Sequence, residues 1–463
     1  MNIDQGLFPI LSDCVFDLER EVPYACALAL QHEGERVVWQ NKRQIVEEIH
    51  PVKGVVLTVF TGKHFIEAAT NDLTSAALRK ATRDLRDMAG YDGIRYDGIE
   101  VDPGPKMKKA YRVECKDRPE QIPLNEKLDA LGDTQAKLRA MDSRIADAVI
   151  QYGHTRDREV FVNRNKLLYQ HLRRTQAVAL VIVREGAKSA SLHTGHCFQG
   201  GWEHAHINEQ ELESLVSDGL LQLAADRLIP GTYDAILSPE FAGLFAHEAF
   251  GHGTEADMFL KKRSMGQAYM GKEVASPLVN MSDDPSLPGQ AGSYLFDHEG
   301  EISSCTRILV GGILTQALTD MNSAMRLNLP RTANGRRESF ERKAYARMSN
   351  TFFESGGHTL DQMLSDIDHG YMLDRPSNGM EDPKGWGIQL EGYLAREIRH
   401  GKLTGRVFSP VIVTGSVPEL LKSISMVGNS VRISGLGMCG KGHKEWVKVT
   451  DGGPYLRLRA RLG

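Results

Sequence analysis

The sequence lacks several features that would assign it to a broad class of protein. It has no run of about 18 apolar residues, the length that a helix needs to span a membrane. It has no excess of basic residues: the formal net charge is −4, which disfavours nucleic acid as the main partner. Its N-terminus lacks the basic start and apolar core of a signal peptide, and its six cysteines follow no motif spacing. We therefore expect a cytoplasmic protein with reduced thiols that binds neither membrane nor nucleic acid.

The composition is that of a globular protein, with 41% apolar and 25% charged residues. A chain of 463 residues exceeds the size of one compact core, so we expect two or three domains. The predicted secondary structure changes after Pro230, where short strands and loops replace longer strands and helices. We expect an α+β fold, with an N-terminal domain over 1–229 that combines an antiparallel sheet with helices, and a β-rich domain over 230–463.

Hydrophobic periodicity indicates the order of the elements in both parts. The N-terminal part is expected to contain strands before residue 70, a helix over 71–90, a loop over 91–122, a helix over about 124–150, strands over about 157–192 and a further helix that includes Leu212 and Leu223. In the C-terminal part, "TYDAILSP" is expected to be a strand, and Gly311-Gly312 fits the tight turn of a hairpin. A short helix is expected in "VPELLKSISMVG".

The stretch "AGLFAHEAFGHGTEAD" contains a histidine, a glutamate and a second histidine that resemble a zinc-peptidase motif with one extra residue. His247 and His252 are five residues apart, which places them about 140° apart on a regular α-helix. The two imidazoles can share a metal if the helix contains a π-bulge, or if it ends before His252 where Gly251 or Gly253 frees the backbone. The remaining alternative is that no metal site exists. The spacing thus predicts a non-α backbone between the two histidines if they share an ion.

The residues around the motif favour a site. Glycines flank His252 where a helix interior disfavours them, and Glu248 stands where a general base beside a metal ion would stand. A catalytic zinc site usually has three protein ligands, so a third is needed. Candidates are Glu255, Asp257, a distant acid or a cysteine. Cys439 lies in the glycine-rich "SGLGMCGKGH", although by itself that loop is more typical of a buried structural cysteine.

A second group of metal-binding residue types occurs between residues 193 and 206. It consists of His193, His196, Cys197, His204 and His206. The spacing matches no standard zinc finger, and the segment has the composition of a polar loop before a helix. Adventitious metal binding is a better interpretation of this segment than a designed site.

Several motifs in order resemble the PmbA/TldD family of metallopeptidases, long labelled modulators of DNA gyrase, and specifically its TldD branch. The stretch "AGLFAHEAFGHGTEAD" is similar to the H-E-x-x-x-H signature of that branch, and "FIEAATNDLT" resembles an N-terminal strand-to-helix junction of the family. The C-terminal motifs follow in the family's order as "FDHEG", "TANGRR", "RMSNT" and "GMCGK". The resemblance covers nearly the whole chain. One departure is His443, where the family more often has glutamine; a surface position is the expected role.

The resemblance implies a site in which His247, His252 and Cys439 bind one divalent metal ion per chain and Glu248 is the general base. Zinc is the expected ion, and iron suits the same ligands. The family fold implies curled antiparallel sheets in the C-terminal metallopeptidase domain, and an N-terminal domain that frames a substrate cavity and a dimer. It also implies a homodimer, or a heterodimer with a PmbA/TldE-like chain, that admits extended, unfolded peptides.

The expected reaction is metal-dependent hydrolysis of unfolded or extended peptides. Asn334, Arg336 and Asn350 are candidates for contacts with the substrate or the oxyanion, against the alternative that they fix loops by hydrogen bonds. The peptide is expected to dock as an added strand on a sheet edge. An alternative function is that of a non-catalytic, PmbA-like partner subunit. A nucleic-acid-linked regulator, as the old family label suggests, disagrees with the negative charge.

Overall fold

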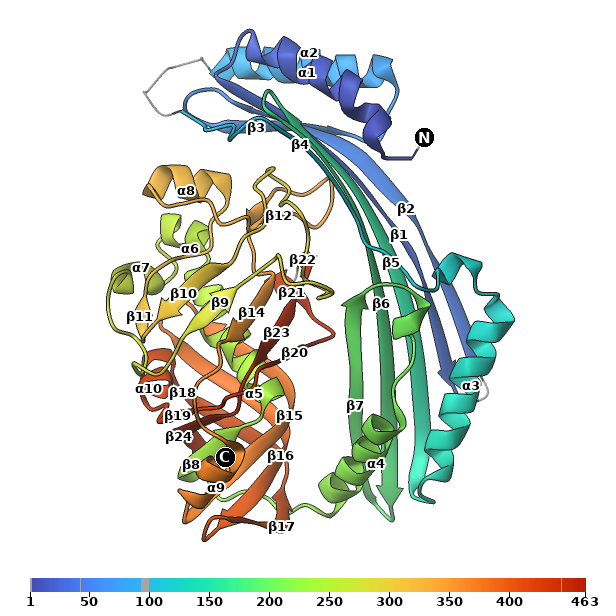
Figure 1. Cartoon of the computed structure of the whole chain (residues 1–463), viewed down its shortest axis with the longest axis vertical. Helices are drawn as coiled ribbons and strands as arrows, with labels where there is room; N and C mark the ends of the chain where they lie inside the picture. Colours follow the sequence, from blue (N-terminus) through green and yellow to red (C-terminus); the bar gives the residue numbers. More distant parts are fainter. Residues whose placement is uncertain (1, 42, 93–99, 443) are drawn as a thin grey trace.

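The computed structural model describes residues 2–41, 43–92, 100–442 and 444–463 (Figure 1). The helices of the N-terminal part are α1 (Phe8–Glu19), α2 (Ser75–Asp92), α3 (Leu124–Ala140) and α4 (Glu209–Ala224), with short 3-10 turns at Gln5–Leu7, Pro119–Gln121 and Trp202–His204. Its strands are β1 (Tyr24–Gln40), β2 (Arg43–Phe60), β3 (Phe65–Thr70), β4 (Met107–Arg112), β5 (Ile145–Asn163), β6 (Lys166–Glu185) and β7 (Lys188–Gln199).

These strands form one sheet in the order β3-β2-β1-β5-β6, with β4 and β7 both paired to β6. All pairs are antiparallel except β4 with β6. Helices α1 and α2 lie across one end of the sheet, and α3 and α4 lie at its other end (Figure 1). Each pair of helices buries apolar side chains against the strands beneath it, and these contacts form two separate hydrophobic clusters.

The structure of this part differs from the sequence prediction in several places. The helix predicted over about 124–150 ends at Ala140, and Ile145 and Ala148 belong to β5 instead. Asp142 accepts a hydrogen bond from the backbone N–H of Arg144, which turns the chain, and the pairing of Ile145 and Ala148 with β6 then outweighs helical spacing. Helix α1 was not predicted, and the loop predicted over 91–122 contains β4, while its residues 93–99 lie outside the described part.

The C-terminal part has short helices and many strands. The helices are α5 (Pro239–Phe245), the π-helix η4 (Ala246–Gly251), the 3-10 turn η5 (His252–Thr254), α6 (Ala256–Leu260), α7 (Gly266–Tyr269), α8 (Met321–Leu327), α9 (Leu360–Ser365) and α10 (Val417–Lys422). The longer strands are β8 (Gly231–Leu237), β10 (Thr306–Val310), β14 (Asn350–Phe353), β15 (His369–Asp382), β16 (Gly387–Arg399), β17 (Lys402–Phe408), β18 (Val411–Ser416), β21 (Met438–Lys441), β22 (Lys444–Lys448), β23 (Thr450–Gly453) and β24 (Leu456–Leu462). The shorter ones are β9 (Met281–Asp283), β11 (Ile313–Leu314), β12 (Gly335–Arg336), β13 (Tyr345–Ala346), β19 (Met426–Val427) and β20 (Arg432–Ser434).

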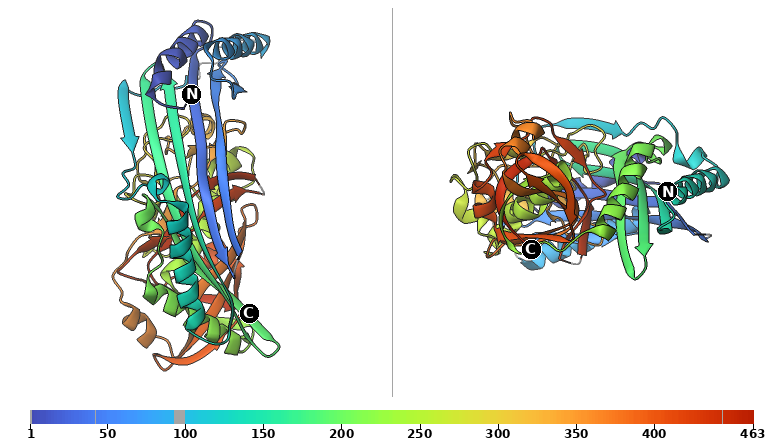
Figure 2. Two further views of the ribbon diagram at one scale, coloured as in Figure 1. Left: turned by 90° about the vertical axis from the view of Figure 1, so that its right-hand side faces the viewer. Right: turned by 90° about the horizontal axis from the view of Figure 1, so that it is seen from below.

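Five of these strands close into a barrel. Strands β15, β8, β24, β18 and β16 pair in that order, and β15 also pairs with β16 (Figure 2). A second sheet has the order β11-β10-β9-β14-β23-β20, and β21 and β22 form a separate hairpin. The mixed fold with a β-rich, curled C-terminal region is therefore as predicted, and so is the hairpin at Gly311-Gly312, where both glycines have positive φ.

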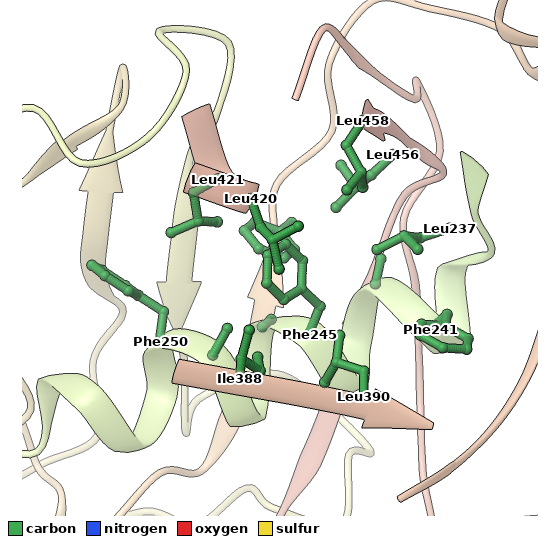
Figure 3. Close-up of a cluster of buried hydrophobic side chains, with 14 of the residues drawn as sticks. Leu237, Phe241, Phe245, Phe250, Ile388, Leu390, Leu420, Leu421, Leu456 and Leu458 are labelled. Carbon is green, nitrogen blue, oxygen red and sulfur yellow. The ribbon is translucent and has the colours of Figure 1, made fainter. Parts of the chain in front are cut away.

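The main hydrophobic core of the C-terminal part surrounds the segment that carries the sequence motif. Phe241, Phe245 and Phe250 follow one another along α5 and η4 and pack among apolar side chains of the neighbouring strands and of α10 (Figure 3). All three rings are buried. This packing holds the motif segment rigidly against the barrel, which is what a site with fixed geometry requires.

One contact between the two parts lies where β6 meets the loop before residue 301. Gln170 accepts hydrogen bonds from the backbone N–H groups of Leu295 and Phe296 and donates one to the carbonyl of Phe296. Arg174 donates to the carbonyl of Ala291. The long sheet therefore stands beside the C-terminal part along its length (Figure 1). Among the described residues, no helix combines the length and the apolar character that crossing a membrane requires.

Candidate metal centre

The motif lies where α5 changes into a π-helix. Ser238 caps α5 by accepting a hydrogen bond from the N–H of Phe241, and Pro239 occupies the first turn. At the other end, the N–H of His252 donates to the carbonyl of His247, a bond between residues five apart. The rings of His247 and His252 consequently lie on the same side, with centroids 5.2 Å apart. This confirms the predicted non-α backbone, in its π-bulge form.

Gly251 was considered as a residue that frees the backbone, but the structure shows that its role is close packing. Its backbone is in the ordinary right-handed region, with φ −61° and ψ −58°, so the turn does not need a glycine for conformational freedom. A Cβ at this position would lie 2.0 Å from the sulfur of Met348, a side chain that is fully buried. The glycine therefore permits close packing of the π-turn against Met348.

Cys439 reaches the two histidines from the hairpin of β21 and β22. Its Sγ atom is 3.1 Å from Nε2 of His247 and 3.3 Å from Nε2 of His252. The three possible ligand atoms all lie within 4.8 Å of one another, and no other such group occurs among the residues that the structure describes. Burial by itself raises the pKa of the Cys439 thiol, but His247 and His252 outweigh it and hold the pKa well below its usual range.

Two buried charged residues, Glu255 and Arg347, contact the proposed ligands His252 and Cys439. Glu255 contacts Nδ1 of His252 at 3.3 Å and accepts a hydrogen bond from Nε of Arg347 at 3.2 Å. The Nη2 atom of Arg347 lies 3.0 Å from the sulfur of Cys439 and donates to the carbonyl of that residue at 2.9 Å. Lys441 also pairs with Glu255, at 3.1 Å. A carboxylate that bonds the second nitrogen of a histidine orients its ring toward a metal ion.

The donor set fits a divalent metal ion. A thiolate and two imidazoles are the ligands that zinc prefers, and three protein ligands leave a further position open, as in catalytic sites. The same atoms are buried or half-buried, which protects a thiolate from solvent. Glu255 and Asp257, considered as third ligands from the sequence, lie outside the group: Glu255 stands behind His252, and Asp257 pairs with Lys441 and Lys261.

Glu248 lies outside the group of three donors, but its carboxyl group is close enough for His247, His252 and Cys439 to shift its pKa. A Cβ on Gly379 of β15 would lie 2.5 Å from Cγ of Glu248, so this strand passes directly over the glutamate. Burial raises the pKa of Glu248 above the usual range of a carboxyl group, against the opposing effect of His247 and His252. Burial likewise raises the pKa of Glu381, on the same strand, to about 9. A carboxyl group with a raised pKa is suited to accept and return a proton near neutral pH.

The structure does not bring Asn334, Arg336 and Asn350 into contact with the three donors. Asn334 and Asn350 are fully buried, and their amide groups donate to Asp283 and to the carbonyl of Asp284, among other acceptors. The guanidinium of Arg336 donates to the carbonyls of Met348 and Lys448, beside a cavity of about 530 Å³ between the two parts of the chain. These contacts fix loops around the site. The substrate contacts predicted for the three residues stay predictions.

The histidine-rich segment between residues 193 and 206 does not form the polar loop that the sequence predicted. Residues 193–199 belong to β7, which pairs with β6, rather than to a polar loop. His196 contacts the carbonyl of His204 and stacks on Phe198. The described residues offer no metal-holding group there. His443 lies outside the described residues.

Two residues of the site were missed in the sequence. Arg347 begins the "RMSNT" motif, so its position carried a signal, but nothing in the sequence indicates that it reaches a thiol 92 residues away. Glu381 carried no signal, because it lies in a charged stretch of ordinary composition at the end of β15.

Comparison with known proteins places the chain among metallopeptidases. Residues 230–461 match the family described as PmbA/TldA metallopeptidase C-terminal domain. The chain is 30% identical to a metalloprotease of Methanothermobacter thermautotrophicus, over 78% of this chain and 79% of the relative. It is 27% identical to the metalloprotease TldD homolog of Haemophilus influenzae, over 96% and 94% of the two chains. It is 30% identical to the zinc metalloprotease TldD homolog of Saccharolobus solfataricus, over 60% and 62%.

Solved structures share the fold. A protein of Bacteroides thetaiotaomicron named as a modulator of DNA gyrase superimposes with a TM-score of 0.77 at 16% identity, over the whole of both chains. TldE of Thermococcus kodakarensis superimposes with a TM-score of 0.73 at 14% identity, over 97% and 98% of the chains. At these identities the likeness concerns the fold alone. The family match and the relatives together show that this chain belongs to the PmbA/TldD family, in its TldD branch, and is a metallopeptidase.

Proposed function

We propose that the chain hydrolyses extended or unfolded peptides with one divalent cation held by His247, His252 and Cys439, and with Glu248 as the general base. The observation that carries this proposal is the convergence of three donor atoms within 4.8 Å at a π-turn. Zinc is the ion that we propose, since sulfur and nitrogen donors suit it; iron is the alternative, because the same donors bind it.

When bound, the ion would supply Lewis acidity toward a peptide carbonyl and toward water. Glu248 would accept a proton from the attacking water at a carboxylate oxygen and return it to the nitrogen of the leaving amine. Its raised pKa supports both halves of this exchange. Glu255 and Arg347 would hold the ring of His252 and the sulfur of Cys439 in place while the proton moves.

The substrate is proposed to lie along β15. This strand pairs with β16 along its length, but on its other edge it pairs with β8 only over residues 370–373. In the described part of the chain, no strand pairs with that edge from Asp374 to Asp382, the stretch that passes over Glu248. An extended peptide can add to an open strand edge through its main chain. Recognition of this kind places few demands on the side chains of the substrate.

We also propose that the chain has two domains, 1–229 and 230–463, and that it is cytoplasmic. We propose that it forms a homodimer, or a heterodimer with a PmbA/TldE-like chain. The likeness to TldE concerns the fold, and the role of a non-catalytic, PmbA-like partner subunit is the alternative function. Light scattering of the purified chain tests whether it dimerises alone.

The change Glu248→Gln tests the proposed reaction. We expect it to retain the metal and to lose hydrolysis by about 100- to 10,000-fold, because glutamine cannot accept the proton. The measurement pairs elemental analysis with cleavage of an unstructured peptide, with and without a chelator. Glu419→Gln, on the exposed face of α10, is the matched control and should behave as the wild type. Wild-type hydrolysis by Glu248→Gln, or hydrolysis that persists after the metal is removed, contradicts the proposal.

A further inference from the structure

The carboxyl group of Glu381 has no hydrogen-bond partner in the part of the chain that the structure describes. The residue stands near the end of β15, and both of its carboxylate oxygens are buried with no hydrogen-bond donor among the described residues. The indole Nε1 of Trp386, in the turn that follows the strand, is also buried and finds no hydrogen-bond acceptor in the described part of the chain. Buried polar groups are nearly always satisfied in native proteins, so two unsatisfied groups in one place indicate that something absent from the chain completes them.

The two groups face the metal centre. Gly379 and Glu381 are two residues apart on one strand, so they point to the same side, and at Gly379 that side is occupied by Glu248. A Cβ on Gly253, the residue after His252, would lie 2.9 Å from Oε1 of Glu381 and 2.9 Å from Nε1 of Trp386. Glu381 and Trp386 therefore flank the backbone that leaves the metal site.

The charged groups around Glu381 are mostly negative, so a cation bound there would be stabilised. Its carboxyl group does not belong to the group of converging metal donors. The charged side chains that act most strongly on it are His252 and three carboxylates, Glu248, Glu255 and Asp382. No lysine or arginine of the described chain bonds to it. A carboxylate buried in such a place is unfavourable unless it takes up a proton or a cation joins it, and the open edge of β15 is where a peptide can bring a cation.

We propose that Glu381 binds a cationic group of the peptide substrate. This group is an ammonium that donates hydrogen bonds to the buried carboxylate oxygens of Glu381. Two sources share this chemistry: the free α-amino group of the peptide and the side chain of a lysine near the scissile bond. The inference rests on the proposed function, because it assumes that peptides bind along β15 beside Glu248. It gives the site a preference that main-chain pairing alone does not provide.

Binding to a variant that does not cleave tests this inference. The protein is full-length Glu248→Gln, metal-loaded, and the probe is an eight-residue neutral peptide with a C-terminal fluorophore. The peptide is prepared in four forms: with a free or an acetylated α-amino group, and with or without one lysine. Dissociation constants come from fluorescence anisotropy. The same titrations are made with Glu381→Gln and, as a matched control, with Glu419→Gln, each added to the Glu248→Gln background.

We expect at least one cationic form to bind about 10- to 100-fold more tightly than the acetylated, lysine-free form. Glu381→Gln should abolish that advantage while leaving metal content and the binding of the neutral form unchanged, and Glu419→Gln should preserve it. The form that gains affinity identifies the source of the cation. If all four forms bind equally to the Glu248→Gln protein, the inference is wrong, even if Glu381→Gln fails to fold.

Hydrolysis by the wild type separates this inference from the proposed function. Metal-dependent cleavage of all four peptides at equal rates would overturn the role of Glu381 and leave the peptidase proposal intact. Absence of metal-dependent cleavage would instead contradict the peptidase proposal, while the binding titrations would still decide whether Glu381 accepts a cation.

Discussion

At the scale of single residues, the sulfur of Cys439 is held from two sides. The π-turn brings His247 and His252 to it, and the guanidinium of Arg347 contacts it from within the protein. Arg347 also bonds Glu255, which contacts the second nitrogen of His252. One fully buried cation therefore fixes two of the three proposed ligands. Its planar group makes these contacts together, which a lysine cannot do.

The change Arg347→Met should weaken metal binding by about 10- to 100-fold, because the supports of a metal ligand set its orientation. It also leaves Glu255 with one cation fewer, so the free energy of unfolding should fall. Competition with a chromophoric chelator measures the affinity, and Arg307→Met, at an exposed ion pair with Glu354, is the control. A folded Arg347→Met protein with wild-type metal affinity would show that the contact has no such role.

At the scale of elements, the π-turn is the feature that makes a five-residue spacing chemically useful. Its glycine is required by packing, since the backbone angles of Gly251 are those of an ordinary helix. The local sequence could predict the departure from α-helix, because the angle between positions five apart follows from helix geometry. It could not choose between a bulge and a helix end, because Met348, which packs against the turn, lies almost 100 residues later in the sequence.

Replacing Gly251 with alanine should destabilise the protein by about 1–3 kcal/mol, since the added methyl group would overlap the buried sulfur of Met348. Metal affinity should fall with it, because the overlap is relieved by moving the turn. Urea denaturation gives the first quantity and chelator competition the second. The double variant Gly251→Ala with Met348→Ala should be less unstable than the sum of the single changes. A Gly251→Ala protein as stable as the wild type would exclude this account.

Contacts with residues distant in the sequence also explain the wrong predictions in the N-terminal part. Helical spacing continues past Met141, but Ile145 and Ala148 gain more from pairing with Val183 and Val181 of β6 than from one further helical turn. The segment at 193–199 is polar, yet it forms a strand because β6 offers it an edge. In both cases the neighbour that decides the conformation is distant in sequence.

At the scale of the whole molecule, the long sheet acts as a frame for the C-terminal part. Gln170 on β6 satisfies three backbone groups of Leu295 and Phe296, and it is almost fully buried. The loop that it holds leads to Asp297, which accepts a hydrogen bond from the N–H of Gly335. The sheet thus supports the loops behind the metal centre without supplying a ligand.

Gln170→Ala should lower the free energy of unfolding by about 1–3 kcal/mol for each backbone group that it leaves buried and unpaired. Hydrogen exchange should rise in residues 291–300, because they lose their anchor on the sheet. Urea denaturation and exchange measured by mass spectrometry are the readouts, and Gln44→Ala at the exposed end of β2 is the control. Unchanged exchange in this loop would mean that the sheet does not hold it.

The sequence by itself determined the fold class, the family and the need for a non-α backbone at the motif, because these depend on periodicity, ordered motifs and local helix geometry. It also singled out His247, Glu248 and His252, which lie within six residues of one another. Only the tertiary structure decided that Cys439 meets both histidines, that Arg347 bonds its sulfur, and that the carboxyl group of Glu381 is buried with no hydrogen-bond partner among the described residues. The physical reason is distance along the chain: contacts between groups some 90 to 190 residues apart depend on how strands and loops pack, which no local pattern records.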